Sequence, residues 1–116
     1  MITVPYTEFH FTEKDFTAVD LENENWLYIC AYRTLSEDFI RKFECFMYWG
    51  HISYLQILSE DFIREFQYKV NWINVCRHQV LSKEFIVEFA DKINFNQIIT
   101  NNKISQDVKD YCRMFL

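Results

Sequence analysis

The chain has 116 residues, of which 50% are hydrophobic and 19% aromatic, with a net charge of −5. This length suits one domain with a sizeable buried core. Phosphate-binding loops need several glycines, so the single glycine, Gly50, excludes Rossmann and P-loop chemistry. No apolar stretch of about 20 residues is present to cross a bilayer, and the N-terminus lacks the basic start and apolar run of a signal peptide.

Residues 1–25 account for the net negative charge of the chain. One lysine, Lys14, accompanies six carboxylates, so this segment has the net charge of the whole sequence and the remainder is neutral. The six acidic residues are Glu8, Glu13, Asp15, Asp20, Glu22 and Glu24. Within residues 1–11, Ile2, Val4 and Tyr6 alternate with other residues, which favours a short extended segment. We expect an acidic N-terminal cap segment over 1–25.

Residues 26–116 follow a 23-residue period. The sequence Leu-Ser-Glu-Asp-Phe-Ile begins at Leu35 and returns at Leu58, and Leu81 begins a third copy that reads Leu-Ser-Lys-Glu-Phe-Ile. A weaker fourth copy begins at Ile104. The same step relates Phe43, Phe66 and Phe89, and also Trp26, Trp49, Trp72 and Phe95. Self-similarity at a fixed period is the signature of a repeat architecture.

Each period contains two helical patterns. In the first, Phe39, Ile40 and Phe43 form an apolar stripe behind Ser36, a favourable N-cap residue. This pattern predicts helices over 36–46, 59–69, 82–92 and 105–113. The second pattern begins at each repeated Trp or Phe and predicts helices of about nine residues, with asparagine caps at Asn25, Asn71 and Asn94.

Neither predicted helix is long enough to be stable alone in water, so each must bury its apolar stripe against its neighbours. The predicted fold is therefore all-α: a short α-solenoid of about four two-helix repeats, with an irregular or short extended N-terminal cap. The predicted division is a cap segment over 1–25 and a helical-repeat domain over 26–116.

The four cysteines do not predict a metal site or a nucleophile. Cys30, Cys45, Cys76 and Cys112 are far apart and form no CxxC pair, which favours reduced thiols in a cytoplasmic protein over a disulfide framework. Only Cys76 and His78 are close in sequence, and positions i and i+2 of a helix point to different faces. We therefore expect no zinc site, no cysteine nucleophile and no cofactor.

The carboxylates of the repeats predict surface ion pairs. Each lies four residues before a basic residue, in the pairs Glu37 and Arg41, Glu60 and Arg64, Glu65 and Lys69, and Glu88 and Lys92. Such helix-face pairs contribute a few tenths of a kcal/mol each. Without a nucleophile and base at hydrogen-bonding spacing, the sequence disfavours an enzyme.

The positions of the second helical pattern that vary between repeats can form a binding surface, although some of them must pack between units; Gln56, Gln79 and Asn101 are among these positions. Within this set, aromatic and basic residues are typical interface anchors, because they combine a large contact area with a polar tip. The candidate binding residues are Tyr28, Tyr32, Arg33, His51, Tyr54, Arg77 and His78, together with the six acidic residues of the cap segment. Ordinary solvent-exposed helix surface is the alternative interpretation.

The unit Leu-Ser-Glu-Asp-Phe-Ile-Arg-x-Phe at 58–66, followed by Lys-Val-Asn-Trp at 69–72, resembles the short tandem repeats of proteins from large DNA viruses and some phages. The resemblance covers about residues 26–112. It implies a viral helical-repeat protein and carries no catalytic residues. The last unit departs from the pattern, since Val108 and Lys109 replace Phe and Ile.

The leading functional hypothesis is a non-enzymatic viral or phage protein that binds a host or viral protein in the host cytoplasm. Inhibition of a host defence or nucleic-acid-processing complex is one form of this hypothesis, with the acidic segment as a nucleic-acid mimic. One alternative is a nucleic-acid-binding repeat protein that uses Arg33, Arg77 and the tyrosines, which the net charge disfavours. Another is a virion or self-assembly component, with a homodimer formed through the apolar end at 114–116.

Overall fold

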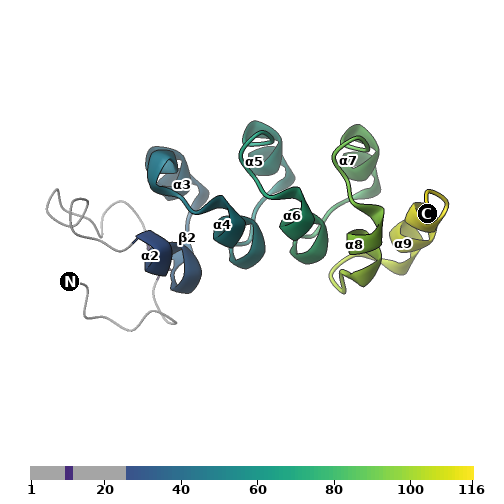
Figure 1. The fold of residues 1–116 in the computed structure, drawn as a ribbon, viewed down its shortest axis with the longest axis horizontal. Coiled ribbons are helices and arrows are strands. Elements are labelled where there is room, and N and C mark those ends of the chain that lie inside the picture. Colours follow the sequence, from purple (N-terminus) through teal and green to yellow (C-terminus); the bar gives the residue numbers. More distant parts are fainter. Residues whose placement is uncertain (1–9, 12–25) are drawn as a thin grey trace, which may run out of the picture. The chain divides into compact units, whose positions relative to one another are not determined.

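The structure is a computed structural model that describes residues 10–11 and 26–116, with side chains from residue 26 onward. The chain divides into two compact units, Met1–Gln56 and Ile57–Leu116. The described part of the chain contains eight α-helices, and its only strands are two residues long (Figure 1). The expected all-α class is therefore confirmed. The expected boundary after residue 25 lies at residues outside the described part.

The first unit contains three α-helices in its described residues. Its elements are β1 (His10–Phe11), α2 (Trp26–Tyr32), β2 (Thr34–Leu35), α3 (Glu37–Lys42), the 3-10 helix η2 (Glu44–Phe46) and α4 (Trp49–Leu55). Helices α2 and α4 pack against each other. Strand β1 pairs with β2 in parallel, with His10 opposite Thr34. Strand β1 is the part of residues 1–11 that the structure describes; Ile2, Val4 and Tyr6, on which the expected extended segment rests, lie outside the described residues.

The second unit contains five α-helices. They are α5 (Glu60–Glu65), α6 (Trp72–His78), α7 (Lys83–Glu88), α8 (Phe95–Thr100) and α9 (Gln106–Arg113). Helix α8 packs between α6 and α9. Helices α5 and α7 lie side by side, as Figure 1 shows, and Arg64 on α5 bonds to Glu88 on α7. Helices that are 23 residues apart in the sequence are therefore neighbours within this unit.

The predicted serine N-caps are present in every repeat. The hydroxyl oxygens of Ser36, Ser59, Ser82 and Ser105 accept from the N–H of the third following residue, at 3.0, 3.1, 3.2 and 3.4 Å. Asn71 and Asn94 cap α6 and α8 in the same way, at 3.0 and 3.2 Å. Asn25, the third predicted asparagine cap, lies outside the described residues.

The helices are shorter than the sequence pattern predicts. The predicted helix 36–46 ends at Lys42, because Phe43 has φ −113° and ψ 30° and leaves the helical conformation. Phe66 and Phe89 end α5 and α7 with almost the same angles. The second pattern predicts helices of about nine residues, whereas α2, α4 and α6 have seven. At each end the chain must turn so that the next apolar stripe also faces the core.

The repeated apolar positions form the core of each unit. Phe39 and Ile40 in the first unit, and Phe62 and Ile63 in the second, are at most 1% exposed. Other buried repeat positions are Ile29, Ile52, Val75 and Ile98 on the second helix of each repeat, and Phe43, Phe66 and Phe89 at the ends of the first. Full burial of such a side chain contributes about 1.5–3 kcal/mol. The packing role predicted for these residues is confirmed.

Buried side-chain amides complete the hydrogen bonding of the segments that link the helices. The Gln56 oxygen accepts from the Leu35 N–H at 2.9 Å, and its NH₂ group donates to the carbonyls of Cys30 and Arg33 at 3.3 and 2.6 Å. In the second unit, the Gln79 oxygen accepts from the Leu58 N–H at 3.0 Å. The Asn101 amide donates to two carbonyls at the end of α6. Gln56, Gln79 and Asn101 are therefore among the varying positions that pack between repeats.

Candidate functional site

Four of the predicted binding residues lie together in the first unit. Tyr28 and Tyr32 on α2 are 46% and 53% exposed, and Tyr54 on α4 is 49% exposed. His51, also exposed, follows Tyr28 by one 23-residue step. The rings of Tyr28 and Tyr32 are adjacent, with centroids 5.3 Å apart. The structure therefore places these side chains on two packed helices, with Tyr28 and His51 at corresponding positions of the repeat.

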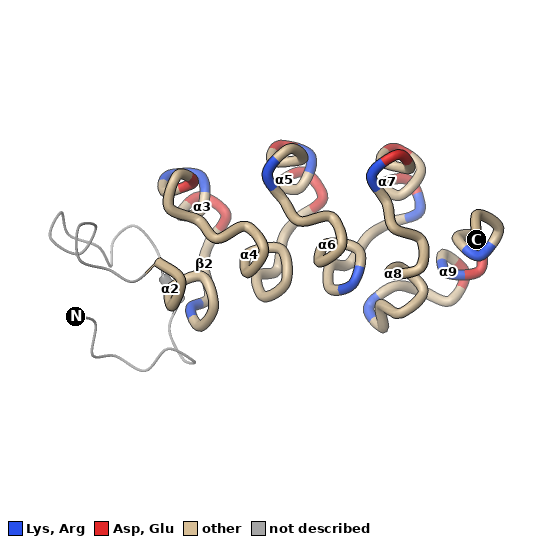
Figure 2. Tube along the Cα trace, in the orientation of Figure 1, with Lys and Arg blue, Asp and Glu red and all other residues tan. Residues whose placement is uncertain are grey.

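The surface around these tyrosines carries no charge from its own helices. Neither α2 nor α4 contains an acidic or basic residue apart from His51, and Figure 2 shows both helices without blue or red. Leu27 and Leu55 are 39% and 46% exposed on the same helices. We define Leu27, Tyr28, Tyr32, Tyr54 and Leu55 as the tyrosine surface. It presents amphipathic rings and aliphatic groups, which suits contact with another protein.

Arg33 is a correction to the predicted binding set. Its side chain is 2% exposed, so it does not present a guanidinium on the surface. By the 23-residue step, Arg33 occupies the same position as the buried Gln56 and Gln79. A position that faces inward in two repeats faces inward in this one as well. The burial of Arg33 could not be predicted from the sequence, because only the structure shows that Gln56 and Gln79 of the same register are buried.

The other two predicted basic residues lie in the second unit. Arg77 and His78 form the last turn of α6, where Arg77 is exposed and His78 is half-buried. Burial lowers the pKa of His78, and the charges of Arg77 and Lys103 lower it further. Lys103, which the sequence pattern missed because it lies between two predicted helices, therefore belongs to the same local cluster.

The six acidic candidates of the cap segment lie outside the described residues. They are Glu8, Glu13, Asp15, Asp20, Glu22 and Glu24. Their role stays a prediction.

A small hollow lies at the start of the first unit's helices. It has a volume of about 310 Å³ and is lined by Trp26, Cys45, Phe46, Met47 and Tyr48. Trp26 and Phe46 stack there with ring centroids 5.0 Å apart and an interplanar angle of 13°. Three of its five lining residues are aromatic.

The buried thiols of Cys30 and Cys76 accept hydrogen bonds from backbone N–H groups. The Cys30 sulfur accepts from the Tyr48 N–H at 3.4 Å, and the Cys76 sulfur accepts from the Asn94 N–H at 3.5 Å. Burial raises the pKa of the Cys76 thiol to about 11. Burial also raises the pKa of Cys30. Because the thiolate is the nucleophile, this environment disfavours covalent chemistry at either residue.

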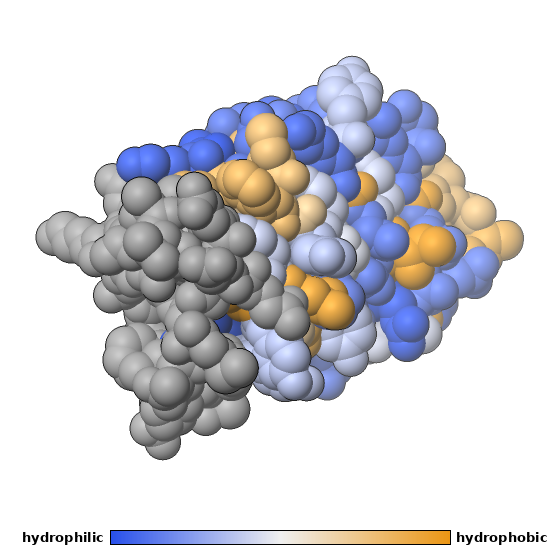
Figure 3. All heavy atoms as spheres, turned by 60° about the vertical axis from the view of Figure 1, so that its left-hand side comes forward, coloured by the Kyte–Doolittle hydropathy of each residue, from blue (hydrophilic) through white to orange (hydrophobic). Residues whose placement is uncertain are grey.

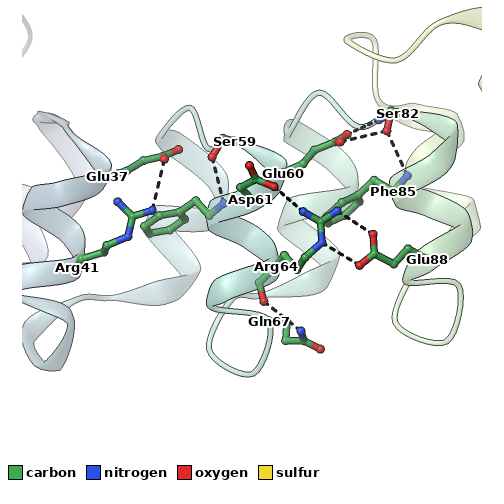
Figure 4. Close-up of polar contacts among 11 residues, drawn as sticks. Glu37, Arg41, Ser59, Glu60, Asp61, Arg64, Gln67, Ser82, Phe85 and Glu88 are labelled. Atoms are coloured by element: carbon green, nitrogen blue, oxygen red, sulfur yellow. Dashed lines mark hydrogen bonds and ion pairs between the residues drawn. The ribbon is translucent and has the colours of Figure 1, made fainter.

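The charged residues of α5 and α7 form a bonded network (Figure 4). Arg64 donates to both carboxylate oxygens of Glu88 at 2.8 and 2.7 Å and to Asp61 at 2.6 Å. The Arg64 hydrogen bonds lower the pKa of Glu88. Glu60 accepts from the backbone N–H and the hydroxyl of Ser82 at 2.6 and 3.1 Å. These charged groups bond to one another and so stabilise the packing of α5 against α7.

Two predicted helix-face pairs are corrected by this network. Glu60 bonds to Ser82 instead of Arg64, and Glu88 bonds to Arg64 instead of Lys92. The packing of the repeats brings the Ser82 N–H and hydroxyl to Glu60, while Arg64 donates to Glu88 and Asp61. Lys92 lies over the ring of Tyr68 at 4.9 Å. The predicted pair of Glu37 and Arg41 is present at 3.9 Å.

Within the described residues, no group of three or more His, Cys, Asp and Glu side chains is placed to hold a metal ion. No helix in that part of the chain is long and apolar enough to span a membrane. Comparisons of the chain with protein-family models, with curated proteins and with solved structures gave no match.

Proposed function

We propose that this protein is a non-enzymatic protein-binding module whose tyrosine surface contacts a host or viral protein. The observation that carries the proposal is an uncharged pair of packed helices with three tyrosines and two leucines about half exposed. A tyrosine buries a large area on binding and loses little conformational entropy, because it has only two side-chain torsions. Residues of this kind dominate the binding energy of protein interfaces.

Surface hydrophobic groups and the aromatic hollow of the first unit also support a protein-binding role. On the face that Figure 3 shows, hydrophobic side chains reach the surface in separate clusters among hydrophilic ones. The aromatic hollow at Trp26 and Phe46 belongs to the same unit as the tyrosine surface. A partner's apolar side chain seated in such a hollow is the usual form of an interface anchor.

The architecture that we propose for this module is a short α-solenoid of about four two-helix repeats. The recurrence of the same serine caps, buried stripes and amide bonds at 23-residue steps supports it. In such an array the core positions are kept from unit to unit while the exposed positions vary. The varying tyrosines then provide the specificity.

Affinity capture from host lysate tests the proposal. The bait is the full chain, compared with a Tyr28→Ala/Tyr32→Ala variant and with a Tyr68→Ala control, which removes a tyrosine that is 86% exposed in the second unit. We expect a protein that the wild type and the control retain and the double variant loses. A photo-crosslinking residue at position 54 should then join that protein directly. Equal retention by all three baits would exclude the tyrosine surface.

The viral setting and action against a host defence complex remain part of the proposal, supported by the resemblance of the repeat unit. The cap segment is proposed as a nucleic-acid mimic because its six carboxylates carry the net charge of the chain. Replacement of these carboxylates by amides should weaken capture and reduce its dependence on salt. Unchanged binding and salt dependence would refute the mimic.

Self-assembly is the second candidate, favoured by the exposed apolar end of the chain. Met114, Phe115 and Leu116 are 76%, 53% and 63% exposed. Sedimentation of the wild type against a Phe115→Ser variant distinguishes the two candidates. A concentration-dependent dimer that the substitution abolishes would support self-assembly, and a monomer at high concentration would exclude it.

A further inference from the structure

Three basic side chains of the second unit gather where helices α6 and α8 end. Arg77 and His78 form the last turn of α6, and Lys103 follows α8 by three residues. The Asn101 amide donates to two backbone carbonyls at the end of α6, at 2.9 and 2.8 Å, which holds the two helix ends together. Lys103 therefore lies close to Arg77 and His78, and the charges of both residues lower the pKa of the imidazole.

Within residues 26–116, Arg77 and Lys103 pair with no carboxylate. Helices α6 and α8 contain no Asp or Glu, and Figure 2 shows blue without red where each of them ends. Among residues 26–116, Arg41, Arg64 and Arg113 each pair with an aspartate three residues earlier, at 2.9, 2.6 and 2.7 Å. No ion pair within that range joins Arg77 or Lys103 to a carboxylate. The fold tolerates these cations because helix C-termini favour positive charge.

Exposed aliphatic side chains flank the cations. Ile73, one helical turn before Arg77 on α6, is 51% exposed, and Val80, two residues after α6, is 64% exposed. We define Ile73, Arg77, His78, Val80 and Lys103 as the basic patch. It combines the positive charges of Arg77 and Lys103, which no described carboxylate pairs with, and the apolar area of Ile73 and Val80, on a chain whose net charge is −5.

We infer that the basic patch binds an acidic segment of a partner protein, whose carboxylates contact Arg77 and Lys103 while an apolar side chain covers Ile73 and Val80. The inference rests on the proposed protein-binding function and adds a second surface of stated ligand chemistry. Charge complementarity favours a carboxylate partner, since oppositely charged patches select and orient binding partners.

A nucleic acid matches the basic patch less well. Non-specific binding to phosphates requires several cations that release counterions together, and the patch has two permanent ones. Single-stranded nucleic acid also needs aromatic rings on which bases stack, whereas Trp72 and Phe95 of these helices are half-buried. A short acidic peptide needs only one or two charged contacts and an apolar flank.

Titration of the isotope-labelled full chain by NMR at low salt tests the inference. The probes are a synthetic peptide of Glu-Glu-Leu repeats, the matched Gln-Gln-Leu peptide and oligothymidylate. We compare wild type, Arg77→Gln/Lys103→Gln and the control Lys69→Gln/Lys92→Gln, which removes two lysines from the same unit and gives the same net charge. Retained amide spectra show that each variant is folded.

We expect the glutamate peptide to shift the amide signals at the ends of α6 and α8, and the glutamine peptide to leave them unchanged. The Arg77→Gln/Lys103→Gln variant should bind about fivefold to tenfold more weakly, and the control should stay within about twofold of wild type. An equal loss in both variants would overturn the inference, since net charge alone would then explain binding.

Two other outcomes would also overturn the inference that the basic patch binds an acidic segment. Absence of glutamate-peptide binding would remove the basic patch as an acidic-segment site, while a captured partner that depends on Tyr28 and Tyr32 would leave the proposed function standing. Tighter binding of oligothymidylate, lost in the Arg77→Gln/Lys103→Gln variant, would assign the basic patch to nucleic acid instead. Equal capture by the wild type and the Tyr28→Ala/Tyr32→Ala variant, with intact glutamate-peptide binding, would refute the tyrosine surface and leave the basic patch standing.

Discussion

Replacement of Gln56 by methionine should destabilise the first unit by about 2–4 kcal/mol. Methionine has nearly the same volume and no amide, so the substitution removes the three hydrogen bonds to Leu35, Cys30 and Arg33 without opening a cavity. Gln56 is 5% exposed, so water does not replace these bonds easily. A hydrogen bond contributes about 0.5–1.5 kcal/mol net, and a buried polar group without a partner costs about 1–3 kcal/mol. The 3.3 Å bond is the weakest of the three, which limits the sum.

Urea unfolding followed by circular dichroism, together with hydrogen exchange at the Leu35 amide, measures this effect. The control is Gln106→Met, which removes an exposed amide that bonds only to the neighbouring Asp110 and should change stability by less than about 0.5 kcal/mol. The reasoning fails if Gln56→Met unfolds within about 0.5 kcal/mol of wild type and the Leu35 amide stays equally protected.

Three further predictions concern single residues. Gly50→Ala should stabilise the chain by about 0.5–1 kcal/mol, because a β-carbon there meets no atom within 4 Å and alanine is the better helix former; a lower unfolding midpoint in urea would contradict this. Cys45, the exposed thiol, should react rapidly with a disulfide reagent while Cys76 reacts only after unfolding, and equal rates in the native protein would refute the burial argument. The folded-state pKa of His78 is lowered, so the unfolded state binds more protons below about pH 6.5. The free energy of unfolding should therefore fall as the pH drops from about 6.5 to the folded-state pKa. A His78→Asn variant that loses as much stability as wild type over this pH range would exclude His78 as the cause.

The 23-residue period and the helical spacing within it predicted the helix caps and the apolar stripes, which depend on residues close in the sequence. A serine hydroxyl needs only the N–H three residues later, so Ser36, Ser59 and Ser82 were predictable as caps from their own repeats. The apolar stripes were predictable for the same reason, since helical spacing decides which side chains share a face. Helix ends were not, because Phe43 and its equivalents leave the helix to bring the following apolar residue into the core.

The candidate site was predictable in part. The tyrosines on α2 and α4 are exposed as the variable register indicated, whereas Arg33 is buried. An arginine is usually exposed, so its residue type suggested a surface cation, but Arg33 occupies the repeat position of Gln56 and Gln79, which is buried. Lys103 could not be assigned to the basic patch from the sequence, because its neighbours at the end of α6 are brought close by the Asn101 hydrogen bonds.

The sequence by itself determined the period, the helical class, the caps and the identity of the core positions, because each depends on spacing within one or two turns. Only the tertiary structure decided which polar groups meet across repeats. Arg64 bonds to Glu88, 24 residues away, and Glu60 bonds to Ser82, 22 residues away. Packing selects such partners, since a side chain bonds to the groups that the fold brings within hydrogen-bonding distance, and these can be far apart in the sequence.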